Sequence, residues 1–148
     1  MNALTQRIPT VARLLLGAIF FVFGLNGFLG FLPQPPLSDA GGAFLGALAA
    51  TGYMFPLIKG TEVLAGALLL GNRFVPLALT LLAPVVVNIF AFHLLLSPGL
   101  GLPAVILALQ LYLAWSYRDA YRGVLSAHVR PAASRAARPS QALAGVEA

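Results

Sequence analysis

Four long apolar segments alternate with short turn-rich stretches along the 148 residues of the chain. They run from about Val11 to Phe31, from Gly52 to Leu70, from Phe74 to Leu96 and from Leu102 to Tyr121. Each segment is close to the roughly 20 residues that a helix needs to cross the hydrocarbon core of a bilayer. The pattern therefore predicts an all-α, polytopic membrane protein, folded as a bundle of four transmembrane helices.

A shorter apolar piece lies between the first two spans. Ser38 or Asp39 can cap a helix over Ala40–Ala50, and this helix is too short to cross a membrane. We therefore expect a short interfacial helix between spans 1 and 2. Pro56 suits the first turn of the second span, and Pro84 inside the third span predicts a kink.

The positive charges predict an orientation. Arginines precede the first span, separate the second from the third and follow the fourth, whereas the other two loops carry neither Lys nor Arg. The positive-inside rule then places both termini in the cytoplasm. Arg7 and Arg13 stand before an apolar run of spanning length, which favours an uncleaved first helix over a signal peptide.

Composition narrows the class further. The chain is 59% hydrophobic and only 9% charged, whereas a soluble domain is about 25% charged. Its net charge of +5 lies at the ends of spans and in the tail, so it does not indicate nucleic-acid binding. The absence of cysteine excludes a cysteine-based disulfide relay, a thiolate metal site and an iron–sulfur cluster. We expect one transmembrane domain over residues 1–122 and a disordered, basic cytoplasmic tail over 123–148.

Lys59 and Glu62 are charged residues one helical turn apart inside the second span. A charge at the centre of a bilayer costs about 2.5–3.5 kcal/mol on insertion scales, so such residues are usually paired or functional. The two side chains can form a structural ion pair that locks two helices, or they can bind a ligand or a proton. Lys59 can also extend to the outer surface.

The expected topology places several polar side chains at one depth. At about 1.5 Å per residue, five of them lie roughly 5–15 Å from the outer boundary, and Gln110 lies near the middle of the fourth span. We predict that the five line a small polar pocket that opens outward. The candidates for ligand binding or proton exchange are Glu62, His93, Lys59, Asn26, Asn88 and Gln110. No catalytic residue and no metal site are assigned.

Each candidate also has a structural interpretation. His93 can be an axial haem ligand, a proton relay or a hydrogen-bond partner of a quinone, or it can simply be hydrogen-bonded near a helix end. His128 lies in the tail and is a poor second haem ligand. Asn26 and Asn88 can join helices through hydrogen bonds. Gly17, Gly24 and Gly27 permit close helix contact, and we expect them to mark a homo-oligomer face.

Two segments and one residue carry a family resemblance. Gly24–Phe31, Lys59–Arg73 and His93 together resemble the DoxX family of small four-span bacterial membrane proteins, over roughly residues 10–122. The most specific part is Glu62-x-x-x-Gly66-x-x-x-x-Gly71. By this resemblance, Glu62 and His93 fall on the acidic and histidine positions of the family.

The resemblance implies a location and a role. It implies a bacterial plasma (inner) membrane protein that acts as an accessory subunit of a membrane redox system, or as a subunit that binds quinone or another small ligand. Quinone is the one cofactor it suggests, and a partner protein would hold any electron-transfer centre. Whether the chain is itself an enzyme stays open. The alternative is a non-catalytic membrane scaffold or a small-solute permease.

Overall fold

A computed structural model describes residues 3–33 and 36–129 of the chain. Within these residues the protein is all-α, with five α-helices followed by one short 3-10 helix. The α-helices are α1 (Ala3–Leu29), α2 (Asp39–Ala50), α3 (Met54–Leu70), α4 (Val75–Leu95) and α5 (Gly101–Ser116), and the 3-10 helix η1 covers Arg118–Tyr121.

The expected short helix is confirmed as α2. Its N-cap is Ser38, whose hydroxyl oxygen accepts a hydrogen bond from the backbone N–H of Gly41 at 3.1 Å. Pro56 lies in the first turn of α3, where a missing N–H costs nothing. The turn from α3 to α4 is tight because Asn72 (φ 53°) and Phe74 (φ 50°) both adopt the left-handed conformation.

Two helix boundaries differ from the sequence pattern. α1 begins at Ala3 and not near Val11, because the helical backbone continues past the apolar stretch into polar residues. α5 ends at Ser116 and not at Tyr121. The Arg118 guanidinium donates to the Trp115 carbonyl at 3.2 Å and so satisfies one of the terminal carbonyls that a helix end exposes.

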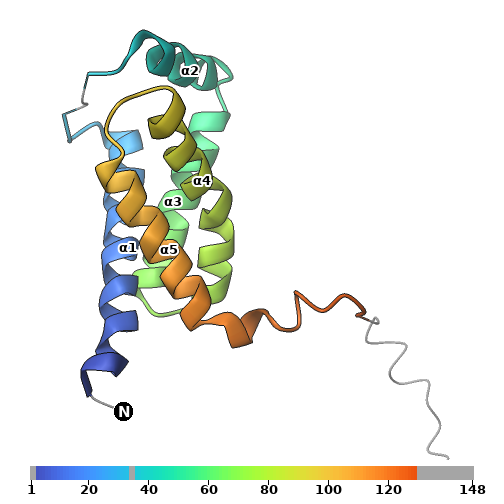
Figure 1. Ribbon diagram of the computed structural model, residues 1–148. Coiled ribbons are helices and arrows are strands. Elements are labelled where there is room, and N and C mark those ends of the chain that lie inside the picture. Colours follow the sequence, from blue (N-terminus) through green and yellow to red (C-terminus); the bar gives the residue numbers. More distant parts are fainter. Residues whose placement is uncertain (1–2, 34–35, 130–148) are drawn as a thin grey trace, which may run out of the picture. The chain divides into compact units, whose positions relative to one another are not determined.

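Four helices pack side by side, with α2 lying across one end of them (Figure 1). α1 and α4 run in one direction, and α3 and α5 run in the other (Figure 1). α3 makes its most extensive contact with α1 and a smaller one with α4. The core between the four helices is apolar, and Leu16, Leu69, Leu79, Leu82 and Leu113 are almost completely buried in it.

Arg13 is buried at the opposite end of the bundle from α2. Only 7% of it is exposed, and its guanidinium donates to the backbone carbonyls of Leu69 and Leu70 at the end of α3. The sequence pattern treats Arg13 only as a flanking charge that sets orientation. The structure adds a second role, since this arginine closes the C-terminus of the neighbouring helix.

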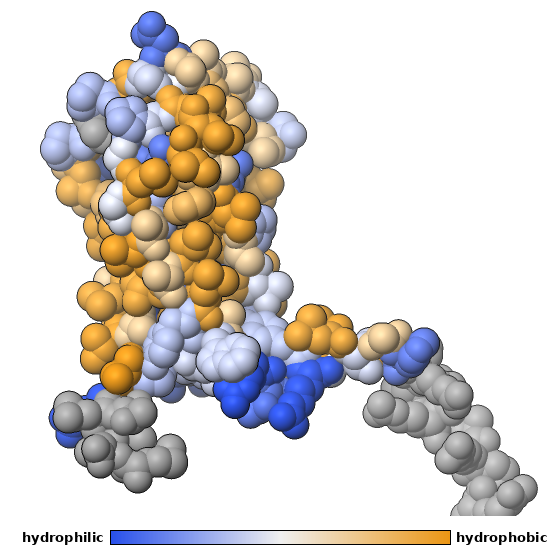
Figure 2. Space-filling model, in the orientation of Figure 1, coloured by the Kyte–Doolittle hydropathy of each residue, from blue (hydrophilic) through white to orange (hydrophobic). Residues whose placement is uncertain are grey.

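Two of the described helices are long and apolar enough to cross a membrane, Arg7–Leu29 within α1 and Val75–Leu95 of α4. A third span results if α2 and α3, which are bent by 94° at their junction, count as one broken crossing. α5 is apolar but has only 16 residues. The structure therefore supports two to three candidate spans rather than the four of the sequence pattern. On the face that Figure 2 shows, hydrophobic residues cover much of the length of the helices.

The chain divides into two compact units, Met1–Arg118 and Asp119–Ala148. In the described part of the second unit, Asp119 and Arg122 form an exposed ion pair of 2.9 Å. Residues 123–129 contain no helix. The rest of the tail, for which the sequence predicts disorder, lies outside the described residues.

Candidate functional site

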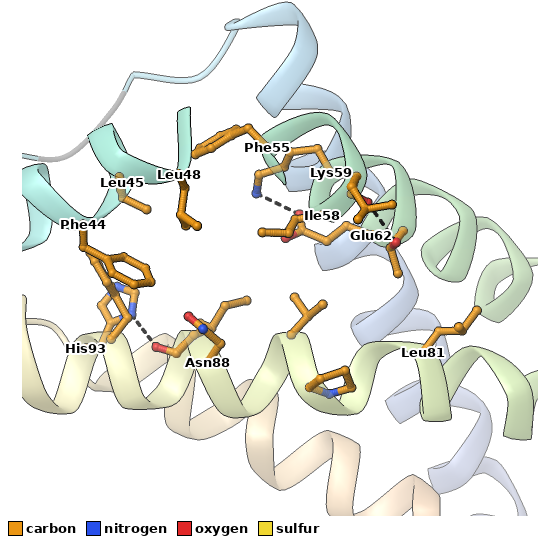
Figure 3. Close-up of a pocket in the computed structure, with 16 residues that line it drawn as sticks. Phe44, Leu45, Leu48, Phe55, Ile58, Lys59, Glu62, Leu81, Asn88 and His93 are labelled. Carbon is orange, nitrogen blue, oxygen red and sulfur yellow. Dashed lines mark hydrogen bonds and ion pairs between the residues drawn. The ribbon is translucent and has the colours of Figure 1, made fainter. Parts of the chain in front are cut away.

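A cavity of about 560 Å³ lies between α2, α3 and α4 (Figure 3). This volume falls within the range of roughly 300–1,000 Å³ that is typical of small-molecule sites. Most of its wall is apolar, and Phe44, Leu48, Ile58, Leu81 and Val85 all contribute to it. The polar residues of the wall are Lys59, Thr61, Glu62, Asn88 and His93.

The α3 wall carries the charged pair. Lys59 Nζ donates to Glu62 Oε2 at 2.8 Å, across one turn of the helix. The Glu62 side chain is 3% exposed and the Lys59 side chain is 22% exposed. The carboxylate is therefore almost wholly enclosed, while the Lys59 side chain is partly exposed. Removal of either charge would leave its partner unpaired in an apolar setting, which is costly.

α1 packs against Lys59 and Glu62 at two glycines. A Cβ at Gly27 would lie 2.5 Å from Cγ and Cδ of Lys59, and a Cβ at Gly24 would lie 3.0 Å from Cβ of Glu62. Both distances are shorter than ordinary Cβ contacts, so a side chain at Gly27 would displace the Lys59 stem and a side chain at Gly24 would crowd Glu62. The aliphatic stem of Lys59 is thus confined before its ammonium reaches Glu62.

The α4 wall carries an amide and an imidazole. Asn88 faces the cavity (Figure 3), and no residue in the described chain hydrogen-bonds its side chain. His93 is half-buried, and its Nδ1 lies 2.9 Å from the Ile89 carbonyl oxygen of its own helix. Their spacing of five residues turns them about 140° apart on an ideal helix. Both nevertheless line this cavity, because it lies between neighbouring helices.

α2 covers one side of the cavity and is fastened to the end of α4. The Ser38 hydroxyl donates to the Leu96 carbonyl, and the ring of Phe44 lies 5.8 Å from that of Phe92. Ser38 therefore has two functions, since it also caps α2. The sequence indicates the cap but gives no sign of the contact with α4.

Asn26 and Gln110 lie outside the cavity lining, in contrast to the convergence that the sequence predicts for Asn26. Both are buried, with 6% of each residue exposed. Asn26 Oδ1 accepts from the Leu32 backbone N–H at 2.6 Å, just beyond the end of α1. Gln110 Nε2 donates to the Leu79 carbonyl at 2.7 Å and joins α5 to α4. Gln110 Oε1 is buried without a partner among the described residues.

The glycine stripe also differs from its sequence interpretation. Gly17, Gly24 and Gly27 all face α3 of the same chain, at Leu69, Val63 and Lys59 respectively. The expectation that these glycines mark a homo-oligomer face is therefore wrong. They permit the close packing of α1 on α3 within one chain.

No cluster of three or more His, Asp or Glu side chains suited to a metal ion occurs in residues 3–33 and 36–129. No protein-family model matches the chain, and comparison with curated proteins and with solved structures gives no significant match. The fold and the site define a class: a small helical protein with two to three candidate membrane spans and, in its described residues, a mostly apolar cavity that carries a few polar groups between its helices.

Proposed function

We propose that this chain is a four-span membrane protein, similar to the DoxX proteins, that binds a small amphipathic ligand between α2, α3 and α4. One observation carries the proposal: an apolar cavity of about 560 Å³ with a charged pair on one wall and an amide and an imidazole on the other. Polar groups of this kind are expensive inside a membrane and are usually functional there.

The alternating directions of the helices support four crossings. α3 has 17 residues and α5 has 16, which correspond to about 26 Å and 24 Å of helix. A hydrocarbon core of about 30 Å can thin locally to accommodate helices of this length. α2 would then lie at the outer interface, and both termini would lie in the cytoplasm of a bacterial cell by the positive-inside rule.

The chemistry of the walls favours a flat ring with polar groups at its ends, such as a quinone headgroup. Apolar side chains would contact the ring, while Lys59 and Glu62 on α3 and Asn88 and His93 on α4 would meet its polar groups. Glu62 and His93 would exchange hydrogen bonds or protons with the ligand, and Asn88 would orient it. Any electron-transfer centre would belong to a partner protein of the redox system.

Ligand titration in detergent tests this function. Menadione, a naphthoquinone with a short substituent, and its reduced form menadiol would be titrated calorimetrically into wild type, Glu62→Gln and Val85→Trp. We expect binding of at least one form to wild type, weaker binding to Glu62→Gln, and loss of binding when Trp fills the cavity. Equal affinity of wild type and Glu62→Gln would remove Glu62 from the site, and no binding of either form would refute the proposal.

One contact favours a second function, a scaffold or permease in which Lys59 and Glu62 form a structural lock. The Lys59 stem is held against Gly27 of α1, so the pair also fixes one helix on another. A lock of this kind predicts strong energetic coupling between the two charges without any ligand.

A further inference from the structure

The polar atoms on the cavity walls differ in whether they donate or accept hydrogen bonds. A carboxylate only accepts, an ammonium only donates, and an amide does both. A ligand that binds here must complement this arrangement. The hydrogen bonds already made within the chain fix which atoms remain available.

His93 is left as an acceptor. A backbone carbonyl oxygen can only accept, so the contact of 2.9 Å between His93 Nδ1 and the Ile89 oxygen requires the ring proton on Nδ1. In the neutral imidazole, Nε2 then carries no proton and can only accept. No residue in the described part of the chain donates to Nε2. A ligand group beside it must therefore bring a hydrogen to donate.

Glu62 is a second acceptor, on the facing wall. Its Oε2 takes the Lys59 hydrogen bond of 2.8 Å, and none of the described residues donates to Oε1. Lys59 uses one of its three N–H donors in this bond, and its side chain is 22% exposed. Thr61 is likewise committed as a donor, since its hydroxyl donates to the Leu57 carbonyl at 2.9 Å.

We infer that the cavity selects ligands that carry hydroxyl donors, such as a hydroquinone or another phenol, over the oxidised quinone of the same ring. This inference rests on the proposed function and concerns the same site. A hydroxyl can donate to His93 or Glu62 and accept from Lys59 or Asn88, whereas a quinone carbonyl can only accept. A carbonyl beside His93 Nε2 would place two acceptors against each other, which leaves both unpaired.

Three probes of nearly the same shape separate donor chemistry from shape. Menadiol has two hydroxyl donors, menadione has two carbonyl acceptors, and the dimethyl ether of menadiol has no donor. Each would be titrated anaerobically into wild type in detergent at one fixed pH. We expect menadiol to bind about tenfold to a hundredfold more tightly than either of the other two probes, because it can donate one or two hydrogen bonds that they cannot.

A pair of variants locates the effect. In His93→Phe the preference for menadiol over menadione should fall about tenfold, while menadione itself still binds. The control is Thr80→Val on the same helix, since Thr80 is exposed outside the cavity lining and bonds only its own helix at the Pro76 carbonyl. This variant should keep the wild-type preference.

The outcomes distinguish this inference from the function on which it rests. If menadiol and menadione bind equally, or menadione binds more tightly, the inference is overturned and the proposed site survives. If the dimethyl ether binds as well as menadiol, shape and not hydrogen bonding decides, and the inference is again overturned. If no probe binds, both proposals fail together.

Discussion

The two sides of α3 are packed in different ways. Toward α1 the contact is so close that a Cβ at Gly66 would lie 2.5 Å from the backbone nitrogen of Phe21. Toward α4 the helices leave a cavity of about 560 Å³. The closed side is built from glycines that let backbones touch, and the open side carries polar groups that no tight packing requires.

Lys59 and Glu62 belong to both sides. The stem of Lys59 and the Cβ of Glu62 lie against the glycines of α1, while both side chains contribute to the cavity wall. A rigid contact with one helix can therefore hold a polar group in place beside a cavity that opens toward another helix. The following changes test how far that division holds.

Removal of one charge of the pair should have the largest effect. Lys59→Met and Glu62→Gln should each destabilise the bundle, Lys59→Met by about 3 kcal/mol, since it leaves the carboxylate buried and unpaired. The double variant should recover much of the loss. Thermal unfolding in detergent of the wild type, both single variants and the double variant gives the coupling energy.

A matched control is the ion pair of Asp119 and Arg122, which has the same spacing of three residues but is exposed. Asp119→Asn should not change stability measurably, because exposed pairs contribute little. Additive effects of the two changes at Lys59 and Glu62 would argue against a structural lock and leave the ligand role as the reason for the pair.

Gly66→Ala should have the next largest effect on the stability of the bundle. Its Cβ would meet the Phe21 backbone and the Gly17 carbonyl oxygen at 2.9 Å, and neither can move aside cheaply. We expect a loss of about 1–3 kcal/mol in the free energy of unfolding. Gly60 is the control on the same helix, because nothing lies within 4 Å of a Cβ there. Gly60→Ala should leave stability unchanged or raise it by about 0.5–1 kcal/mol. Similar stability changes in Gly66→Ala and Gly60→Ala would mean that α1 does not pack closely on α3 at Gly66.

Much of this arrangement could be predicted from the sequence, because apolar runs and caps are local signals. The positions of α2, α3 and α4 follow from Ser38, Pro56 and the apolar segments. Four candidate residues, Lys59, Glu62, Asn88 and His93, line one cavity, but its wall is mostly apolar, whereas the sequence pattern predicts a small polar pocket.

The other contacts depend on which face of each helix packs against which neighbouring helix. The spacing of residues along the sequence does not determine this pairing. Gln110 contacts the opposite side of α4, and Asn26 binds the chain beyond its own helix. The glycine stripe correctly indicates close contact but cannot identify the partner helix. Arg13 resembles every other flanking arginine in the sequence, yet it is buried against the end of α3.

Asn88→Leu tests the open side alone. Asn88 makes no hydrogen bond with any described residue, so its loss should change stability by less than about 0.5 kcal/mol. Affinity for menadiol should fall about tenfold, which is the cost of roughly one hydrogen bond. Calorimetric titration measures it, with Thr80→Val as the variant that should leave affinity unchanged. A large loss of stability in Asn88→Leu would show that this wall also has a structural role.

Gly27→Ala should have a smaller effect on stability than Gly66→Ala, and it tests where the closed side ends. Its Cβ would collide with Cγ and Cδ of Lys59, which belong to a flexible side chain, whereas a Cβ at Gly24 would lie 2.9 Å from the Val63 backbone nitrogen. Gly24→Ala should therefore destabilise as Gly66→Ala does, while Gly27→Ala should cost less than about 1 kcal/mol. Thermal unfolding of both variants compares the two costs.

Because the lysine must shift to make room, Gly27→Ala should still weaken ligand binding through the displaced ammonium. Unchanged affinity in Gly27→Ala would mean that α1 only packs against Lys59 and does not position it for the cavity.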